Sequence, residues 1–167
     1  MSNHGAMKSL PNAVLAAPLL FALVSLMSCT TTPGGPAVSS EPAPTVSDEQ
    51  WRLQRELAGT PVDVDLDSAG RLLVSVPLRY CFDPGRSAVK PPLGAVLEKL
   101  AGGLKRQNTT LRVRAPGDPR GGRFLATDRA ASVRDYLVAL GVSATRFAGV
   151  APAEGDAVEI FVEERPR

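Results

Sequence analysis

From Val62 onward, the sequence switches repeatedly between a two-residue and a helical hydrophobic period, and this switching most limits the folds it can adopt. Apolar residues alternate with aspartates over residues 62–67. A turn signal follows at 68–70, and a second strand-like run occupies 71–77. Two short alternating runs separated by a turn signal predict a β-hairpin.

Two segments with a helical period follow the hairpin. The first begins near Lys90, where two prolines suit a first helical turn. Its apolar residues recur at helical spacing, and they are Leu93, Val96, Leu97, Leu100 and Leu104. The second helix is predicted over about 126–140, ending at Gly141. Its expected buried face consists of Ala130, Val133, Leu137 and Leu140.

Further strands are predicted at 111–115, 147–150 and 158–162, with a short turn over 143–146. The resulting β-α-β-α-β-β order predicts an α/β fold of the α+β sandwich type, with two helices on one face of a mixed sheet. A hairpin and a short N-terminal helix precede this core.

The first 46 residues read as a leader and a tether. Residues 10–27 are apolar and carry no charge, as expected for the core of a signal peptide over residues 1–28. The sequence Leu-Met-Ser-Cys ending at Cys29 resembles a bacterial lipobox, which predicts a lipidation site carrying acyl chains such as palmitate. A transmembrane helix and a chance cysteine are the alternatives. Thr30 follows the cysteine, and the lack of an aspartate there favours the outer membrane by the same resemblance.

After Cys29, residues 30–46 are mainly Pro, Gly, Ser, Thr and Ala, so residues 29–46 are expected to form a flexible linker. Ser47 begins a capping-box pattern, which predicts a short helix over residues 47–59. Trp51 is expected to pack onto the domain that follows at 61–167, with a partner contact as the alternative.

Composition excludes several functions. The only histidine, His4, lies in the predicted leader, so the mature chain has no imidazole for catalysis or metal binding. With no motif of paired catalytic carboxylates either, we expect no enzymatic activity, no cofactor and no metal. The formal net charge of +2 does not call for nucleic acid as a partner.

Three further sets of residues could suggest a function, but we interpret each of them as structural. Asp63, Asp65 and Asp67 lack the loop of a calcium site and are expected on a solvated strand face. Cys81 has no histidine to activate it and is expected to be a buried strand thiol. A basic edge is expected from the arginines and lysine at Lys105, Arg106, Arg112, Arg114, Arg120 and Arg123.

The stretch 74–163 resembles the OmpA-like domain, the peptidoglycan-associating module of OmpA, MotB and the peptidoglycan-associated lipoproteins. The similarity runs through Phe-Asp-Pro-Gly-Arg-Ser-Ala-Val-Lys-Pro at 82–91. It continues through Leu-Ala-Thr-Asp-Arg-Ala-Ala-Ser-Val-Arg-Asp-Tyr-Leu at 125–137, which is the most specific element. Gly-Val-Ser-Ala-Thr-Arg-Phe at 141–147 and Val-Glu-Ile at 158–160 complete it.

The resemblance implies a binding site made of Asp118 and Arg129, because an Asp and an Arg at these positions hold the diaminopimelate of a peptidoglycan stem peptide in the family. A carboxylate and a guanidinium fork suit a ligand that presents an ammonium beside a carboxylate. The chain differs from the family pattern at 115–118, where it has Ala-Pro-Gly-Asp, and at 155–157, where it has Gly-Asp-Ala instead of a pair of arginines.

Together these features predict an outer-membrane lipoprotein that faces the periplasm and binds peptidoglycan non-covalently, tethering the envelope to the cell wall. Its expected partners are peptidoglycan, the membrane through the lipid anchor, and other envelope proteins. The alternative is a structural or assembly lipoprotein that uses the same fold to bind a protein partner without binding peptidoglycan.

Overall fold

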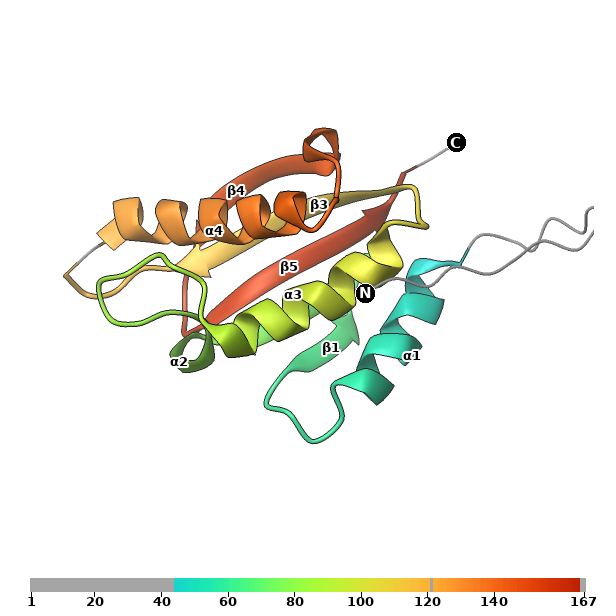
Figure 1. Cartoon of the computed structure of the whole chain (residues 1–167), viewed down its shortest axis with the longest axis horizontal. Helices are drawn as coiled ribbons and strands as arrows, with labels where there is room; N and C mark the ends of the chain where they lie inside the picture. Colours follow the sequence, from blue (N-terminus) through green and yellow to red (C-terminus); the bar gives the residue numbers. More distant parts are fainter. Residues whose placement is uncertain (1–43, 121, 166–167) are drawn as a thin grey trace, which may run out of the picture. The chain divides into compact units, whose positions relative to one another are not determined.

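The computed structural model describes residues 44–120 and 122–165. The predicted signal peptide, Cys29 and most of the linker lie outside these residues. The described part follows the order α1-β1-β2-α2-α3-β3-α4-η1-β4-β5 (Figure 1). Its buried hydrophobic residues lie between Val46 and Val162, and the segment from Ser40 onward is one compact unit. This segment therefore contains a complete core of its own and is expected to fold by itself.

A single mixed sheet holds the described strands together. The strands are β1 (Asp63–Leu66), β2 (Leu72–Pro77), β3 (Thr109–Pro116), β4 (Phe147–Ala153) and β5 (Ala157–Glu164). Their order in the sheet is β1-β2-β5-β3-β4. Strands β3 and β4 are parallel, and the other neighbouring pairs are antiparallel. The predicted mixed sheet and its initial hairpin are confirmed.

Helices cover one face of this sheet. Helices α3 (Pro91–Leu104) and α4 (Gly122–Ala139) lie across it, and α1 (Val46–Glu56) packs beside α3 and β1 (Figure 1). Alternate strand residues are buried beneath the helices, namely Val64, Leu72, Val74, Val76, Leu111, Val113, Ala115, Val158, Ile160 and Val162. Each fully buried aliphatic side chain contributes about 1.5–3 kcal/mol. The apolar residues that recur with a two-residue period in the strands and those that recur with a helical period in the helices therefore pack into one core.

Element boundaries differ from the prediction in three places. The cap of α1 is Thr45, not Ser47: the Asp48 N–H donates to the Thr45 hydroxyl at 3.2 Å, and the Thr45 N–H donates to the Asp48 carboxylate at 2.9 Å. Thr45 and Ser47 each begin the spacing of a capping box. The box that begins at Thr45 is completed by the Asp48 carboxylate, and it allows Val46 to be buried. Helix α4 begins at Gly122, about a turn early. Cys81 is buried as predicted, but in the short helix α2 (Leu78–Cys81) and not in a strand.

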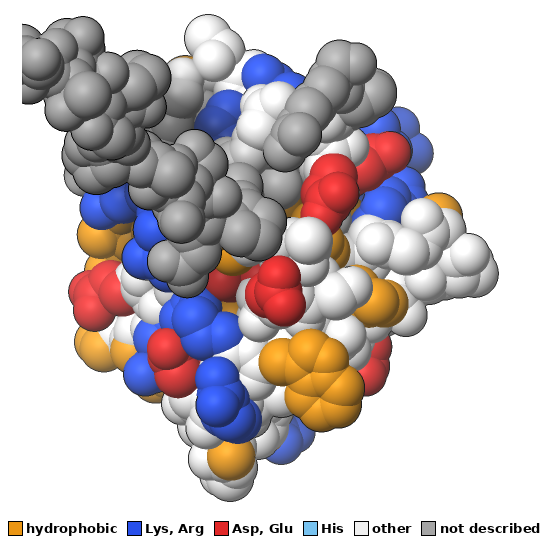
Figure 2. Space-filling model, turned by 90° about the vertical axis from the view of Figure 1, so that its right-hand side faces the viewer, with side chains coloured by type: hydrophobic (Ala, Val, Ile, Leu, Met, Phe, Trp, Pro, Cys, Tyr) orange, Lys and Arg blue, Asp and Glu red, His pale blue; other side chains and the backbone are white. Residues whose placement is uncertain are grey.

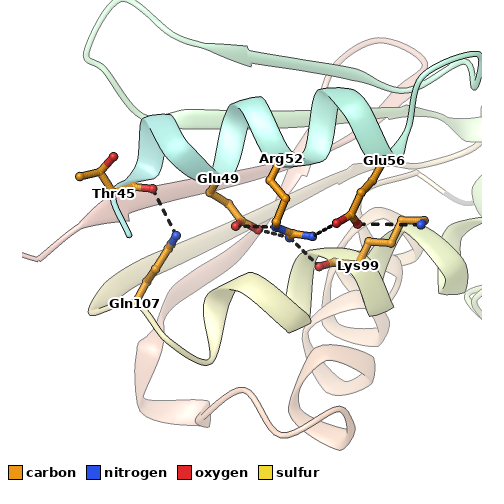
Figure 3. Close-up of polar contacts among 6 residues, drawn as sticks. All are labelled: Thr45, Glu49, Arg52, Glu56, Lys99 and Gln107. Carbon is orange, nitrogen blue, oxygen red and sulfur yellow. Dashed lines mark hydrogen bonds and ion pairs between the residues drawn. The ribbon is translucent and has the colours of Figure 1, made fainter. Parts of the chain in front are cut away.

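A polar network fixes α1 to α3 (Figure 3). Glu49 is only 3% exposed, and its carboxylate accepts two hydrogen bonds from Arg52, one of them at 2.9 Å. Arg52 also donates to the Lys99 carbonyl oxygen at 2.8 Å and pairs with Glu56 at 2.7 Å. The Glu49 carboxylate lies against Gly103, where a side chain would overlap it. The buried charge is thus paired, and α1 is held to the domain by more than apolar contact.

The beginning of α1 is also fixed to the sheet. The Val46 N–H donates to the Glu164 carboxylate at the end of β5, at 2.8 Å. The Gln107 amide donates to the Thr45 carbonyl oxygen at 3.3 Å, just before β3 begins. The chain therefore joins the domain at the end of the sheet where β3 starts and β5 finishes.

Within residues 44–120 and 122–165, no helix has the length and apolar character needed to cross a membrane. Over the same residues, no cluster of three or more His, Cys, Asp or Glu side chains is placed to hold a metal ion.

Candidate functional site

Asp118 and Arg129 meet at the end of the sheet opposite the start of α1. Asp118 follows β3 by two residues, in the loop that leads into α4. Arg129 lies in the third turn of α4 and points back toward this loop, because its neighbours Ala126, Ala130 and Val133 face the core. The loop between α2 and α3 runs beside both residues. Sheet and helix thus place the predicted pair within contact distance.

Every N–H group of Arg129 has a partner inside the protein. The Nη1 group donates to Asp118 Oδ1 at 2.8 Å and to the Pro116 carbonyl oxygen at 3.0 Å. The Nη2 group donates to Asp118 Oδ2 at 3.0 Å and to the Asp83 carbonyl oxygen at 3.3 Å. The Nε group donates to the Arg86 carbonyl oxygen at 2.9 Å. A guanidinium offers five N–H donors, so none remains for a ligand in this arrangement.

Arg129 is 1% exposed, and this burial is sustained by its partners. A buried charge is costly unless it is paired and hydrogen-bonded, and Arg129 meets both conditions. Its guanidinium also lies over the Phe82 ring, 5.2 Å from the centroid, in a cation–π contact. The side chain therefore joins three segments: the loop after α2, the end of β3 and the loop that carries Asp118.

Asp118 has the opposite character, because its side chain is 20% exposed. The Gly85 N–H donates to Asp118 Oδ2 at 2.5 Å. The hydrogen bonds from Arg129, followed by the one from Gly85, lower the pKa of the Asp118 carboxyl from its ordinary value, so the group is ionised at neutral pH. A carboxylate has about four acceptor positions, and Arg129 and Gly85 use three of them. Asp118 thus keeps acceptor capacity at the surface.

Asp118 borders two shallow depressions. Pro84, Gly85 and Arg120 line the first beside it. Arg123 and Gly155 belong to the lining of the second, together with the start of α4. An ionised carboxylate between two exposed arginines can bind an ammonium group while a guanidinium binds a neighbouring carboxylate. The site can therefore accommodate a ligand that carries both charges.

Other residues singled out in the sequence lie elsewhere. Trp51 is 66% exposed, so the prediction that it packs onto the domain is wrong. On α1 the core is reached by Val46, Leu53 and Leu57, and Trp51 lies on another side of the helix. Burial raises the pKa of the Cys81 thiol to about 12, which suits an inert residue.

The predicted basic edge is not a single surface. Arg112 and Arg114 lie on β3, whereas Arg120 and Arg123 lie in the loop and first turn beside Asp118. Asp63 and Asp65 are exposed on β1 as predicted. The prediction is wrong for Asp67, which lies after the end of β1 and accepts hydrogen bonds from the Ala69 N–H, the Arg71 N–H and the Arg71 side chain in the turn.

Backbone groups are the part of the site that the sequence did not reveal. The carbonyl oxygens of Asp83, Arg86 and Pro116 and the N–H of Gly85 hold the pair, and backbone groups carry no side-chain signal. The one available sign was the Asp-Pro-Gly turn: Gly85 has φ +69°, a conformation that favours glycine, and it aims its N–H at Asp118.

Comparison with known proteins relates the segment that carries this site to a protein family. The OmpA family model matches residues 81–161. The cell wall anchor of the T6SS from Pseudomonas aeruginosa has a similar structure, with a TM-score of 0.58 at 20% identity over 74% of this chain and 99% of the other. A putative MotB-like protein from Desulfovibrio vulgaris gives 0.57 at 18% identity, over 72% of this chain and 92% of the other.

A periplasmic domain of Helicobacter pylori MotB gives a TM-score of 0.54 at 15% identity, over 65% of this chain and 83% of the other. A search of curated proteins finds no match. At these identities the structural similarity establishes the fold, and the family match covers the segment that contains both Asp118 and Arg129. Residues 81–161 of this chain therefore form a domain of the OmpA family.

Proposed function

We propose that this protein binds peptidoglycan non-covalently through Asp118 and its surroundings, and that it is held in the outer membrane by acyl chains on Cys29. The observation that supports this most directly is the partly exposed, ionised carboxylate of Asp118, fixed in place by a fully bonded Arg129. Diaminopimelate in a stem peptide offers an ammonium group beside a carboxylate, which matches the charges at this surface. The function is binding, and no step of catalysis is part of it.

The two predicted residues have different roles in this proposal. Asp118 accepts the ammonium group of the ligand. Arg129 is a positioning residue, since its five N–H groups are already used to hold Asp118 and the adjoining loops. Arg120 and Arg123 are exposed, each lines a depression that Asp118 also lines, and both are suited to the ligand carboxylate.

The placement of the site agrees with a lipid anchor at the other end of the chain. The linker joins the domain near Thr45, where α1 is bonded to Gln107 and Glu164. Asp118 lies just beyond the far end of β3, a strand of eight residues that spans about 25 Å at about 3.3 Å per residue. A domain tethered by its linker to a membrane can therefore turn Asp118 toward the cell wall.

Co-sedimentation with purified, protein-free sacculi tests this function. The segment from Ser40 onward should pellet with sacculi, and Asp118→Asn should weaken binding about 10- to 100-fold, because a charge-assisted hydrogen bond contributes about 1.5–3 kcal/mol. The matched control is Asp135→Asn, an exposed aspartate of α4 that pairs only with Arg134 among the described residues, and it should bind like the wild type. A folded wild-type domain that stays in the supernatant would refute peptidoglycan binding.

One observation favours the second candidate, a lipoprotein that binds a protein partner. Trp51 is 66% exposed and Phe124 is 87% exposed, and large exposed aromatic residues are common anchors in protein interfaces. Viewed from the side where β5 ends, the domain shows hydrophobic side chains in several places among charged and polar groups (Figure 2). Retention of an envelope complex by Asp118→Asn, and its loss in Trp51→Ala, would favour this candidate.

A further inference from the structure

The face of the sheet opposite the helices carries charges in an ordered pattern. Strand residues that alternate with the buried ones point to this face, which we call the open face. Helices α1, α3 and α4 contribute to the core on the other side of the sheet (Figure 1). The register of the strands allows the residues of the open face to be read in rows across the sheet.

The first row crosses four strands. Asp65 of β1 is paired with Leu73 of β2, which is paired with Phe161 of β5, which is paired with Arg112 of β3. Asp65 and Arg112 are exposed, and the apolar residues between them are only half-buried. The row thus runs from an acid through two apolar side chains to a base.

The second row also has an aspartate at one end and an arginine at the other, but its two middle residues are polar. Asp63 of β1 is paired with Ser75, then with Glu159 of β5, then with Arg114 of β3. Arg114 Nη1 lies 3.3 Å from Glu159 Oε2 and forms an ion pair with it, and this buried oxygen accepts no hydrogen bond within the described residues. In both rows the acid lies on β1 and the arginine lies on β3, two strands away on the other side of the β2–β5 pair.

This pattern is complementary to itself. Consider a second copy whose open face lies against the open face of the first. The two copies are related by a twofold axis that runs parallel to the strands and passes between β2 and β5. Asp65 then faces Arg112 of the other copy, and Asp63 faces Arg114, each contact occurring twice. Leu73 faces Phe161, and the Ser75 hydroxyl faces Glu159, whose Oε2 atom lacks a hydrogen bond. An axis perpendicular to the strands would instead place acids opposite acids, so the charges select one arrangement.

We propose that the open face binds a second copy of this chain in this arrangement. A second argument rests on the proposed function. An axis parallel to the strands keeps both Thr45 ends on one side of the dimer and both Asp118 sites on the other. Two copies anchored in the same membrane can then both reach the wall, and two sites on one particle bind a polymer with avidity.

The expected dimer is weak and sensitive to salt. Four overlapping strands at about 4.8 Å spacing and about five residues at about 3.3 Å give a contact of about 19 by 17 Å. This is smaller than the roughly 800 Å² per partner of a standard stable interface. If the linkers of both copies are anchored in one membrane, the effective concentration of the domains rises, and this compensates for the small contact area.

Reciprocal charge reversal tests the proposal in sedimentation velocity measurements on the segment from Ser40 onward. One variant carries Asp63→Lys and Asp65→Lys, and the other carries Arg112→Asp and Arg114→Asp. Each alone should raise the dimer Kd at least about 100-fold, because like charges then face each other at every contact. An equimolar mixture should dimerise again to within about tenfold of the wild type, because each variant then presents opposite charges to the other.

A matched control and a wild-type measurement complete the test. A variant with Asp128→Lys and Asp135→Lys changes the net charge by the same amount as the variant with Asp63→Lys and Asp65→Lys. Its substitutions lie at exposed positions of α4, so it should leave the Kd unchanged. Raising the salt from about 0.05 M to about 1 M should dissociate the wild-type dimer without any substitution. A wild type that is monomeric at every concentration, a mixture that stays monomeric, or a dimer insensitive to salt would overturn the proposal.

Discussion

Two adjacent glycines of α3 allow the α1–α3 contact to be tested by the same substitution with opposite expected effects. A side chain added at Gly102 meets nothing within 4 Å, so Gly102→Ala should stabilise the domain by up to about 1 kcal/mol through helix propensity. A side chain added at Gly103 would overlap the carboxylate of Glu49. That carboxylate is 3% exposed and bonded to Arg52, so it cannot move aside without leaving its partner.

The size of the effect follows from what Gly103→Ala would break. The pair between Glu49 and Arg52 is charge-assisted, and such hydrogen bonds contribute about 1.5–3 kcal/mol. After the gain in helix propensity of about 1 kcal/mol is subtracted, Gly103→Ala should destabilise the domain by about 0.5–2 kcal/mol. The two alanine variants should therefore differ by about 1.5–3 kcal/mol in their free energy of unfolding.

Urea denaturation of the two variants and the wild type, in the segment from Ser40 onward, measures this difference directly. Glu49→Gln combined with Gly103→Ala is informative as well, because removing the charge should lessen the penalty of the alanine. Equal stability of Gly102→Ala and Gly103→Ala would refute the conclusion that the buried Glu49 carboxylate is held against α3.

Three further outcomes are expected. Arg129→Leu should destabilise the domain by about 3–5 kcal/mol in urea denaturation, because it removes a donor from three carbonyl oxygens and leaves the Asp118 carboxylate with only the Gly85 N–H. The Cys81 thiol, whose pKa is raised to about 12, should not react with Ellman's reagent at about pH 8 in the folded state and should react fully in urea. Asp118 has a lowered pKa in the folded state, so its stabilising effect is complete above its ordinary pKa and is lost as the pH falls through the folded value. Stability of the wild type should therefore decline more steeply in acid than that of Asp118→Asn, and parallel pH profiles would contradict the assignment.

Much of the fold could be predicted because each element carries its own hydrophobic period. The stripe from Leu93 to Leu104 and the alternation around Val74 are local patterns, and both are buried as expected. Helix starts were less predictable. Thr45 and Ser47 both begin a capping-box spacing, and what separates them is the burial of Val46 against the rest of the domain, which is a tertiary effect.

The sequence singled out two residues of the candidate site but did not indicate how they are bonded. Asp118 and Arg129 could be singled out by resemblance to a family motif. That Arg129 would be buried with every donor occupied depends on three backbone carbonyl groups, two from the loop after α2 and one from the end of β3, and no residue type signals them. Trp51 was misjudged for a related reason: an aromatic residue in an amphipathic helix usually packs inward, but here Leu53 and Leu57 already fill the contact with the domain.

The fixation of α1 at Thr45 determines how the domain would resist a pull between membrane and wall. Tension would pass from the start of α1 to Asp118, nearly along β3 and its antiparallel neighbour β5. The hydrogen bonds between antiparallel strands lie perpendicular to the strands. Such a load therefore shears all of the β3–β5 bonds together instead of opening them one after another. Under the proposed function, the domain would therefore bear force as a mechanical link, and the Glu49–Arg52 pair would help to keep α1 attached.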